Sequence, residues 1–304
     1  MTTPSDGART DQTAERTGVT NTQVSRGDLV FSVRESGPRD GELVVLLHGF
    51  PQFSDSWDAL VPVLTSHGYR TLAMDQRGYS VGARPSGRWA YRMSELVADV
   101  VALIDAHGGK PVHVVGHDWG AAVAWALTVA RPDKVRSLTA LSVPHPGGFV
   151  KAMATSVQGI ASWYMYLFQL PWLPEKLLHS QQLRLRAMSG QAVEHARRDA
   201  SHFPDPTAWT GPLNWYRAVI FNNPRVLSKR VHRPTLFVWS DGDTAITRRA
   251  AEICADYVDA PFQFETLRGV NHWIPEAATS ELAALLIPHL RRWSTNPSTP
   301  SQTS

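Results

Sequence analysis

The sequence predicts an α/β fold with a mostly parallel central sheet and helices on both of its faces. Short apolar runs alternate with helical patterns along the chain, and this alternation is typical of a parallel sheet. The runs in the middle of the chain are nearly all apolar, as expected of strands covered on both faces. The alternation stops after Val143 and returns at Pro234, which indicates a helical insertion over the sheet edge.

Strands and helices are assigned from these patterns in chain order. The predicted strands are 42–49, 70–75, 111–116, 137–143, 234–240 and 262–267. A helix is predicted over 94–109, with Ser94 as its N-cap and Gly108 and Gly109 at its end. A second helix, over 121–131, stops before Pro132.

Domain boundaries follow from where these signals begin and end. We expect flexible polar tails over 1–24 and 294–304, a core made of 25–145 and 230–293, and a helical cap over 146–229. The 304 residues suit one large domain with an inserted lobe.

Composition restricts the partners of the chain. There are 30 Lys and Arg against 27 Asp and Glu, so the net charge is +3, and no long basic run points to nucleic acid. The single Cys254 excludes an intrachain disulfide and fits a reducing compartment, and the N-terminus lacks the apolar core of a signal peptide, so we expect a cytoplasmic protein. A homodimer is left open.

One uncharged stretch invites a membrane interpretation. Residues 152–174 carry no charge, but they include polar side chains and the two prolines Pro171 and Pro174. A membrane span needs about 20 mostly apolar residues. We therefore expect no membrane span here, and interpret the stretch as a buried, aromatic-rich helix.

Chemically active residue types follow four of the predicted strands. In an open parallel sheet, ligands bind beyond the carboxyl ends of the strands. The four loops are His48-Gly49-Phe50-Pro51, Gly116-His117-Asp118-Trp119-Gly120, Asp241-Gly242-Asp243 and Val270-Asn271-His272-Trp273. An acid, a second acid and a His follow one another in the order nucleophile, acid, His of a strand–turn–helix hydrolase, with Asp118 where Ser is usual.

Each of these residues also has a plainer explanation. Asp118 suits a helix N-cap, and Asp243 suits a turn, where Asp241 competes with it for any acidic role. His272 taken alone suits a partly buried imidazole with a hydrogen-bond partner. The combination of four loops in the right order is more specific than any single one. His48 and His117 are expected to pack or to form hydrogen bonds without a catalytic role.

The segments HGFP, GHDWG, SDGD, NHW and GPLNWYR (211–217) together resemble the soluble epoxide hydrolases of the α/β-hydrolase fold, over residues 25–292. This resemblance implies a helical cap inserted after the sixth strand of the fold. It also implies an oxyanion hole formed by the backbone N–H groups of Phe50 and Trp119, and two cap tyrosines that hold the epoxide oxygen. Tyr216 matches one of these positions. Tyr164 and Tyr166 compete for the other: residues two apart on a helix face different directions, so only one of them can point at the site, and Tyr164 is preferred.

The chemistry explains a carboxylate nucleophile independently. A carboxylate suits displacement at a saturated carbon and gives an alkyl ester, which water activated by His272 and Asp243 then hydrolyses. Asp118 should remain ionised at a helix N-terminus. An epoxide opens to an alkoxide that needs a proton, and a phenol is a suitable donor.

We expect an epoxide hydrolase that acts on a small apolar epoxide and water in an apolar pocket with walls from Trp119, Phe50, Trp163, Phe168 and Trp273. No cofactor is expected, and no metal either, because the chain has neither a Cys pair nor a His-Glu-x-x-His helix.

Several other functions compete with this prediction. A haloalkane dehalogenase uses the same nucleophile, but Phe50 rather than Asn follows His48-Gly49, and the strand ending in LSVPHP carries no acid. A haloacid dehalogenase would need a basic clamp, and Arg84, Arg88 and Arg217 are the candidates. A non-catalytic ligand-binding protein of this fold would be expected to lack the His or the acid. A lyase or a cofactor-free oxygenase usually has Ser in place of Asp118.

Overall fold

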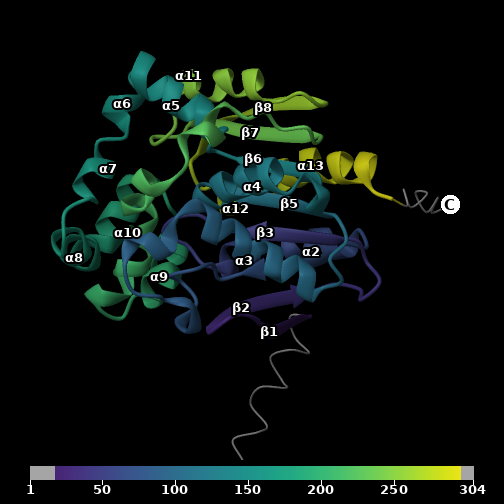
Figure 1. Ribbon diagram of the computed structural model, residues 1–304, viewed down its shortest axis with the longest axis horizontal. Coiled ribbons are helices and arrows are strands. Elements are labelled where there is room, and N and C mark those ends of the chain that lie inside the picture. The colour runs from purple at the N-terminus through teal and green to yellow at the C-terminus, as the bar shows by residue number, and fades with distance from the viewer. Residues whose placement is uncertain (1–17, 296–304) are drawn as a thin grey trace, which may run out of the picture.

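Eight strands form one sheet in the order β1-β2-β4-β3-β5-β6-β7-β8 in the computed structural model, which describes residues 18–295 (Figure 1). The strands are β1 Val19–Arg26, β2 Leu29–Ser36, β3 Leu43–Leu47, β4 Arg70–Met74, β5 Val112–His117, β6 Val135–Leu141, β7 Thr235–Gly242 and β8 Phe262–Asn271. The strand β2 pairs antiparallel with β1 and β4, and all other pairs are parallel. The predicted mostly parallel sheet is confirmed.

Helices cover both faces of this sheet, as the side chains of β3 illustrate. Val45 and Leu47 belong to one buried cluster with residues of α3 and α4, whereas Val44 and Leu46 belong to a second cluster with α2 and α13. This alternation follows from the two-residue period of a strand. The helices outside the cap are α2 Val61–Ser66, α3 Met93–Ala106, α4 Trp119–Ala130, α11 Arg248–Glu252, α12 Ile274–Ala277 and α13 Thr279–Trp293.

The predicted helical insertion follows β6, the sixth strand along the chain. Its helices are α5 Pro146–Thr155, α6 Gln158–Ala161, α7 Tyr164–Leu167, α8 Leu173–Met188, α9 Val193–Ser201 and α10 Thr210–Arg217. In Figure 1 they gather on the left side of the molecule, beyond the carboxyl ends of the parallel strands. The cap therefore covers the edge of the sheet at which the sequence predicts the site.

Two features of the N-terminal part differ from the sequence prediction. The predicted tail over 1–24 is wrong from Val19 onward, because Val19–Arg26 forms β1 and pairs with β2 along its whole length. Both strands were missed because neither has the long apolar run of the buried strands: β1 is mostly polar and lies at the sheet edge, and β2 is only partly buried. The helix α3 takes Arg92 rather than Ser94 as its N-cap. The remainder of the predicted tails, 1–17 and 296–304, lies outside the described residues.

Buried polar contacts tie the cap to the core beside the site. Arg186 of α8 is 3% exposed; it pairs with Asp199 of α9 at 3.1 Å and donates to the Pro51 carbonyl at 2.9 Å. Arg198 of α9 pairs with Glu276 of α12. The cap is thereby fixed to the loop after β3 and to the helix after β8. Over residues 18–295, none of the helices has the length and apolar character that crossing a membrane requires.

Candidate active site

Asp118 lies at the sharp turn between β5 and α4. Its backbone is in an unusual conformation, with φ 52° and ψ −120°. A side chain on Gly116 would strike the backbone oxygen of Gly120, and a side chain on Gly120 would strike the backbone oxygen of Leu47. The strand and the helix approach each other so closely that only glycine fits at these two positions of Gly-x-Asp-x-Gly. This close approach places Asp118 at the sheet edge.

We expect Gly120→Ala to lower the free energy of unfolding by about 1–3 kcal/mol, because the new methyl group meets backbone atoms that cannot rotate away. Denaturant titration measures this loss. Gly148→Ala in α5 is the matched control: there the nearest atom lies 3.5 Å from the new carbon, so its stability should stay within about 1 kcal/mol of the parent. Equal effects of both substitutions would contradict the close-packing explanation.

The Asp118 carboxylate does not cap its own helix. Its side chain makes no cap hydrogen bond, and Oδ1 instead accepts from the Phe50 backbone N–H at 2.7 Å. The Trp119 N–H lies in the first turn of α4, where no intrahelical carbonyl is in reach. Of the two N–H groups predicted as an oxyanion hole, that of Phe50 thus contacts the carboxylate, and that of Trp119 follows Asp118 directly in the chain.

His272 and Asp243 complete the cluster from the loops after β8 and β7. The imidazole Nδ1 lies 2.8 Å from Asp243 Oδ2, and Nε2 lies 3.6 Å from Asp118 Oδ2. The second oxygen of Asp243 accepts from the backbone N–H groups of Ala245 and Ile246, which fixes the carboxylate in place. The structure brings together the three residues that the loops predicted.

Charge pairing outweighs burial at both ends of this cluster. Burial alone would raise the pKa of Asp118, but the hydrogen bond and positive charge of His272 hold it below its ordinary value. Burial alone would lower the pKa of His272, but the charge of Asp243, together with Asp118, raises it to about 10. Asp118 is therefore a carboxylate and His272 an imidazolium at neutral pH.

The two acids at the end of β7, Asp241 and Asp243, point in different directions. Asp241 is exposed, and its Oδ1 accepts from the backbone N–H of Gly269. The Asp243 side chain is fully buried and faces His272. Asp241 therefore supports the turn, as its position in SDGD also allowed.

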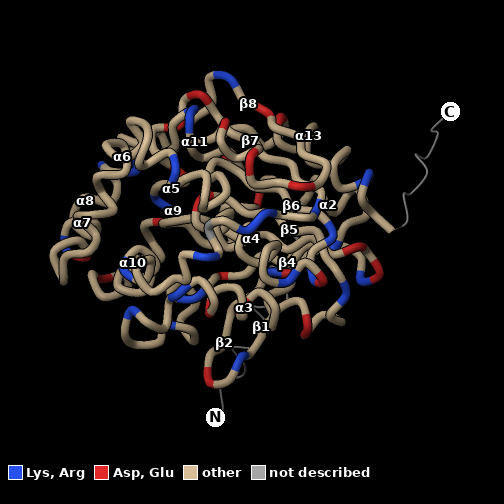
Figure 2. Tube along the Cα trace, turned by 45° about the horizontal axis from the view of Figure 1, so that its top comes forward, with Lys and Arg blue, Asp and Glu red and all other residues tan. Residues whose placement is uncertain are grey.

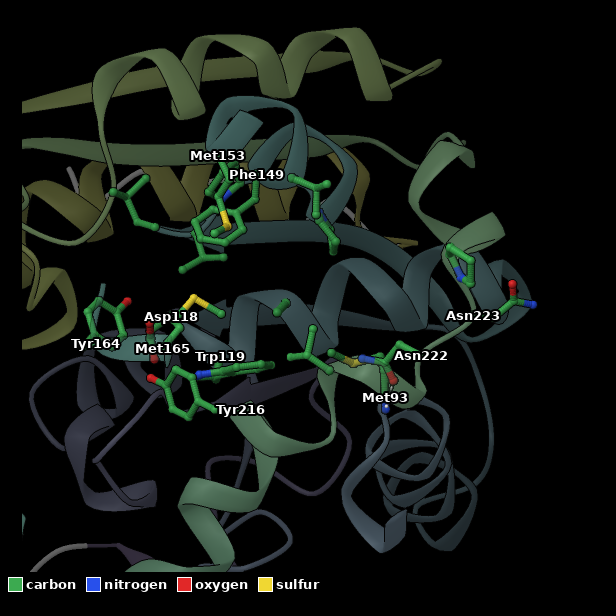
Figure 3. A pocket seen from close by; sticks show the side chains of 18 residues that line it. Met93, Asp118, Trp119, Phe149, Met153, Tyr164, Met165, Tyr216, Asn222 and Asn223 are labelled. Carbon is green, nitrogen blue, oxygen red and sulfur yellow. Dashed lines mark hydrogen bonds between the residues drawn. The ribbon is translucent and has the colours of Figure 1, made fainter. Parts of the chain in front are cut away.

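Two tyrosines of the cap lie with Asp118 at one end of a cavity (Figure 3). Tyr164, the first residue of α7, and Tyr216 of α10 both line it, and their ring centroids are 6.2 Å apart. Burial, and next the charge of Asp118, raises the pKa of each phenol. Both phenols are therefore protonated at neutral pH. Tyr166 is 66% exposed and faces away, in agreement with the preference for Tyr164.

The remaining histidines of the loops have structural contacts. His117 Nε2 lies 2.9 Å from the His272 carbonyl oxygen, and burial lowers the pKa of His117 to about 4. His48 Nε2 accepts from the Gln76 backbone N–H. Both rings hold loops in position, as the sequence predicts.

The cavity is a long, mostly apolar space of about 300 Å³ between core and cap. Figure 3 shows Asp118, Tyr164 and Tyr216 at one end and Asn222 and Asn223 at the other. Between them the walls are mainly apolar, and they include Ala122, Val143, Phe149, Met153 and Met165. Sequence reasoning missed the lining residues of α5 and those near Asn222, because nothing in their local pattern separates a cavity wall from a packed helix.

The predicted aromatic walls need correction. Trp119 lines the cavity, whereas Phe50 and Phe168 lie behind Tyr216, with ring centroids 5.1 and 4.9 Å from its ring. Trp273 is buried and packs edge-on against the His272 ring, with centroids 5.4 Å apart, but it does not line the cavity. Trp163 is 62% exposed and faces away from the site.

The site offers no obvious place for a metal. Among the residues that the structure describes, His, Cys, Asp and Glu side chains form no group of three or more suited to a metal ion. What the cluster presents instead is a carboxylate, an imidazolium and two phenols around an apolar cavity.

Comparison with known proteins shows the family to which the chain belongs. Residues 42–277 match the family model described as alpha/beta hydrolase fold. The chain is 32% identical to epoxide hydrolase 2 of Caenorhabditis elegans over 80% of this chain and 72% of that protein. It is 29% identical to epoxide hydrolase A of Mycobacterium tuberculosis, over 85% and 93% of the two chains. The crystal structure of epoxide hydrolase A from Mycobacterium thermoresistibile superposes with a TM-score of 0.79 at 27% identity, covering 91% of this chain and 99% of that one.

Proposed function

Because this chain belongs to the α/β-hydrolase fold family, with epoxide hydrolases among its relatives, we propose that it hydrolyses epoxides to vicinal diols through an alkyl ester on Asp118. One observation carries the proposal: a carboxylate nucleophile and two protonated phenols share the same end of an apolar cavity. The carboxylate suits attack on a saturated carbon, and the phenols suit protonation of the oxygen that leaves it.

In the first step Asp118 opens the epoxide. Its Oδ1 is held by the Phe50 N–H, so Oδ2 is the oxygen free to attack. The new bond joins Oδ2 to an epoxide carbon, the bond from that carbon to the epoxide oxygen breaks, and the resulting alkoxide takes the phenol proton of Tyr164 or Tyr216. The imidazolium of His272 then returns a proton to the phenolate.

Ester formation prepares His272 for the second step. The positive charge of His272 depends in part on the hydrogen bond and the negative charge of Asp118, and both are lost on esterification. The neutral imidazole, oriented by Asp243, removes a proton from water while the water oxygen bonds to the ester carbonyl carbon. The N–H groups of Phe50 and Trp119 stabilise the oxyanion. The intermediate then breaks the bond to the alkoxide, which takes the carboxyl proton and leaves as the diol.

The pKa of His272 predicts how stability changes with pH. Its value is about 10 in the folded chain and about 6.5 when unfolded, so the contribution is complete below pH 6.5 and is lost as the pH rises to 10. We expect the unfolding free energy of the parent to fall more steeply between pH 6.5 and 10 than that of His272→Gln. Denaturant titrations at several pH values measure this. Parallel curves would show that the two pKa values of His272 are similar.

A substrate panel tests the proposed function. The chain is offered epoxides of increasing size and matched chloro- and bromoalkanes, and diol and halide are quantified. We expect diol from apolar epoxides and little halide. Halide release without diol would favour a haloalkane dehalogenase.

A haloacid substrate is disfavoured because the three candidate arginines are engaged elsewhere: Arg217 pairs with Glu175, Arg84 donates to the Tyr79 carbonyl and Arg88 lies over the Phe221 ring. Ligand binding with neither product would favour the non-catalytic alternative. A cytoplasmic location stays a prediction from the sequence, which leaves a homodimer open.

A further inference from the structure

We infer that the outer face of the cap binds the surface of an anionic lipid bilayer. Four apolar side chains recur at every third position through α6 and α7: Val157, Ile160, Trp163 and Tyr166, which are 66%, 77%, 62% and 66% exposed. The backbone N–H groups of Ile160, Trp163 and Tyr166 each donate to the carbonyl three residues before, as in turns of three residues, so these side chains lie on the same side. Trp172 and Leu177, at and after the start of α8, are 63% and 38% exposed. These six residues are called the outer cap face.

The outer cap face lies on neighbouring elements. In both Figure 1 and Figure 2, α6, α7 and α8 form the left border of the molecule. Large apolar side chains exposed together on neighbouring helices are typical of contact with a partner or a membrane. We therefore expect a partner or a membrane to cover these side chains.

The orientation of α6 and α7 is held by buried polar residues. Gln158 and Ser162 are fully buried and hydrogen-bonded to each other at 2.9 Å. Gln158 also donates to the Ala245 carbonyl and accepts from the Thr247 backbone N–H, both in the loop after β7. The segment thus buries amide and hydroxyl groups while it exposes Ile160 and Trp163. These hydrogen bonds fix the rotation of the segment about its axis. The fold itself therefore holds the aromatic side chains facing outward.

The exposed charges within the segment that carries this face have one sign. Between Ala152 and Val193 the only acid is Glu175, and it is buried and paired with Arg217 at 2.7 Å. Lys176 and Arg184 are exposed, and Lys176 Nζ lies 5.2 Å from the Trp172 ring centroid. In Figure 2 the tube over α6 and α7 is almost entirely tan.

This composition fits an anionic lipid surface better than a second copy of the chain. Trp and Tyr prefer the membrane–water interface, and Lys and Arg beside them are attracted to anionic headgroups. A two-fold pairing of the outer cap face would instead bring two positively charged surfaces together. No helix of residues 18–295 could span the bilayer, so the contact is peripheral. Since α7 also carries Tyr164 and Met165 on its cavity side, docking would hold the cavity close to lipid.

Vesicle co-sedimentation of the full chain tests this inference independently of epoxide hydrolysis. Vesicles of phosphatidylcholine with phosphatidylglycerol are compared with phosphatidylcholine alone, at low and high salt. We expect binding to the anionic vesicles that weakens with salt. Trp163→Ser with Trp172→Ser should weaken it at least about tenfold, and Lys176→Glu with Arg184→Glu should do the same. Trp89→Ser is the matched control, because this Trp is 56% exposed and lies outside the outer cap face.

All of these variants should keep the parent activity on a water-soluble epoxide, since none of the changed residues lines the cavity. Absence of binding to anionic vesicles by the parent would overturn the inference. So would equal binding to neutral vesicles, or equal loss in Trp89→Ser. If sedimentation velocity shows a parent dimer that the Trp163 and Trp172 variant converts to a monomer, without vesicle binding, the face belongs to a second copy and the inference is wrong.

Discussion

His272→Gln should stop turnover while leaving the attack on the epoxide intact. Asp118 Oδ2 needs no base to react, so the alkyl ester should still form, but glutamine cannot take the proton of the hydrolytic water. We expect diol production to fall by about 10²–10⁴-fold. A burst of one ester per chain should precede the stall. Mass spectrometry of the digested protein should find the added mass on the peptide that contains Asp118.

The exposed His232→Gln is the matched control, because it makes the same change far from the cluster and should keep the parent rate. The adduct also reports on the leaving group. An ester that accumulates only with haloalkanes would mean that the chain displaces halide. No adduct from any substrate, together with lost turnover, would show that His272 is needed before the covalent step.

The chain order of the loops made the core of the site predictable. Asp118, Asp243 and His272 each follow a strand of a parallel sheet, so their meeting at one edge follows from the fold class alone. The expectation that only one of Tyr164 and Tyr166 faces the site also depended on helix geometry alone, and the structure places Tyr164 in the cavity wall and exposes Tyr166. Inferences of this kind succeed because the period of a helix and the direction of parallel strands are local properties.

What could not be predicted depends on contacts between distant segments. Asp241 and Asp243 are equivalent in the sequence, and they are distinguished by the Gly269 N–H on one side and His272 on the other. Trp163 was expected in the pocket because aromatic residues are usually buried. It faces outward because Gln158 forms its hydrogen bonds to the loop after β7, and no pattern in α6 reveals that partner. Apolar character therefore predicted burial where the tertiary contacts give exposure.

Tyr216→Phe and Tyr164→Phe should each slow epoxide opening by about 10²–10⁴-fold, and the double variant should leave little diol production. The substitution removes only the hydroxyl, so the ring packing of Tyr216 against Trp119, with centroids 4.9 Å apart, is kept. The loss should fall on kcat of the alkylation step, because the developing alkoxide, rather than the bound epoxide, requires the proton. Stopped-flow measurement of ester formation in the His272→Gln background isolates this step.

Tyr166→Phe supplies the control for both variants. It makes the same chemical change two residues from Tyr164, on a side chain that is 66% exposed, and should keep the parent rate. Displacement of bromide from a bromoalkane needs no proton, so any such activity should survive in the double variant. Loss of epoxide opening with retained halide release would therefore assign the phenols to the epoxide oxygen. Undiminished diol formation by the double variant would mean that a different group, such as the His272 imidazolium, protonates the alkoxide.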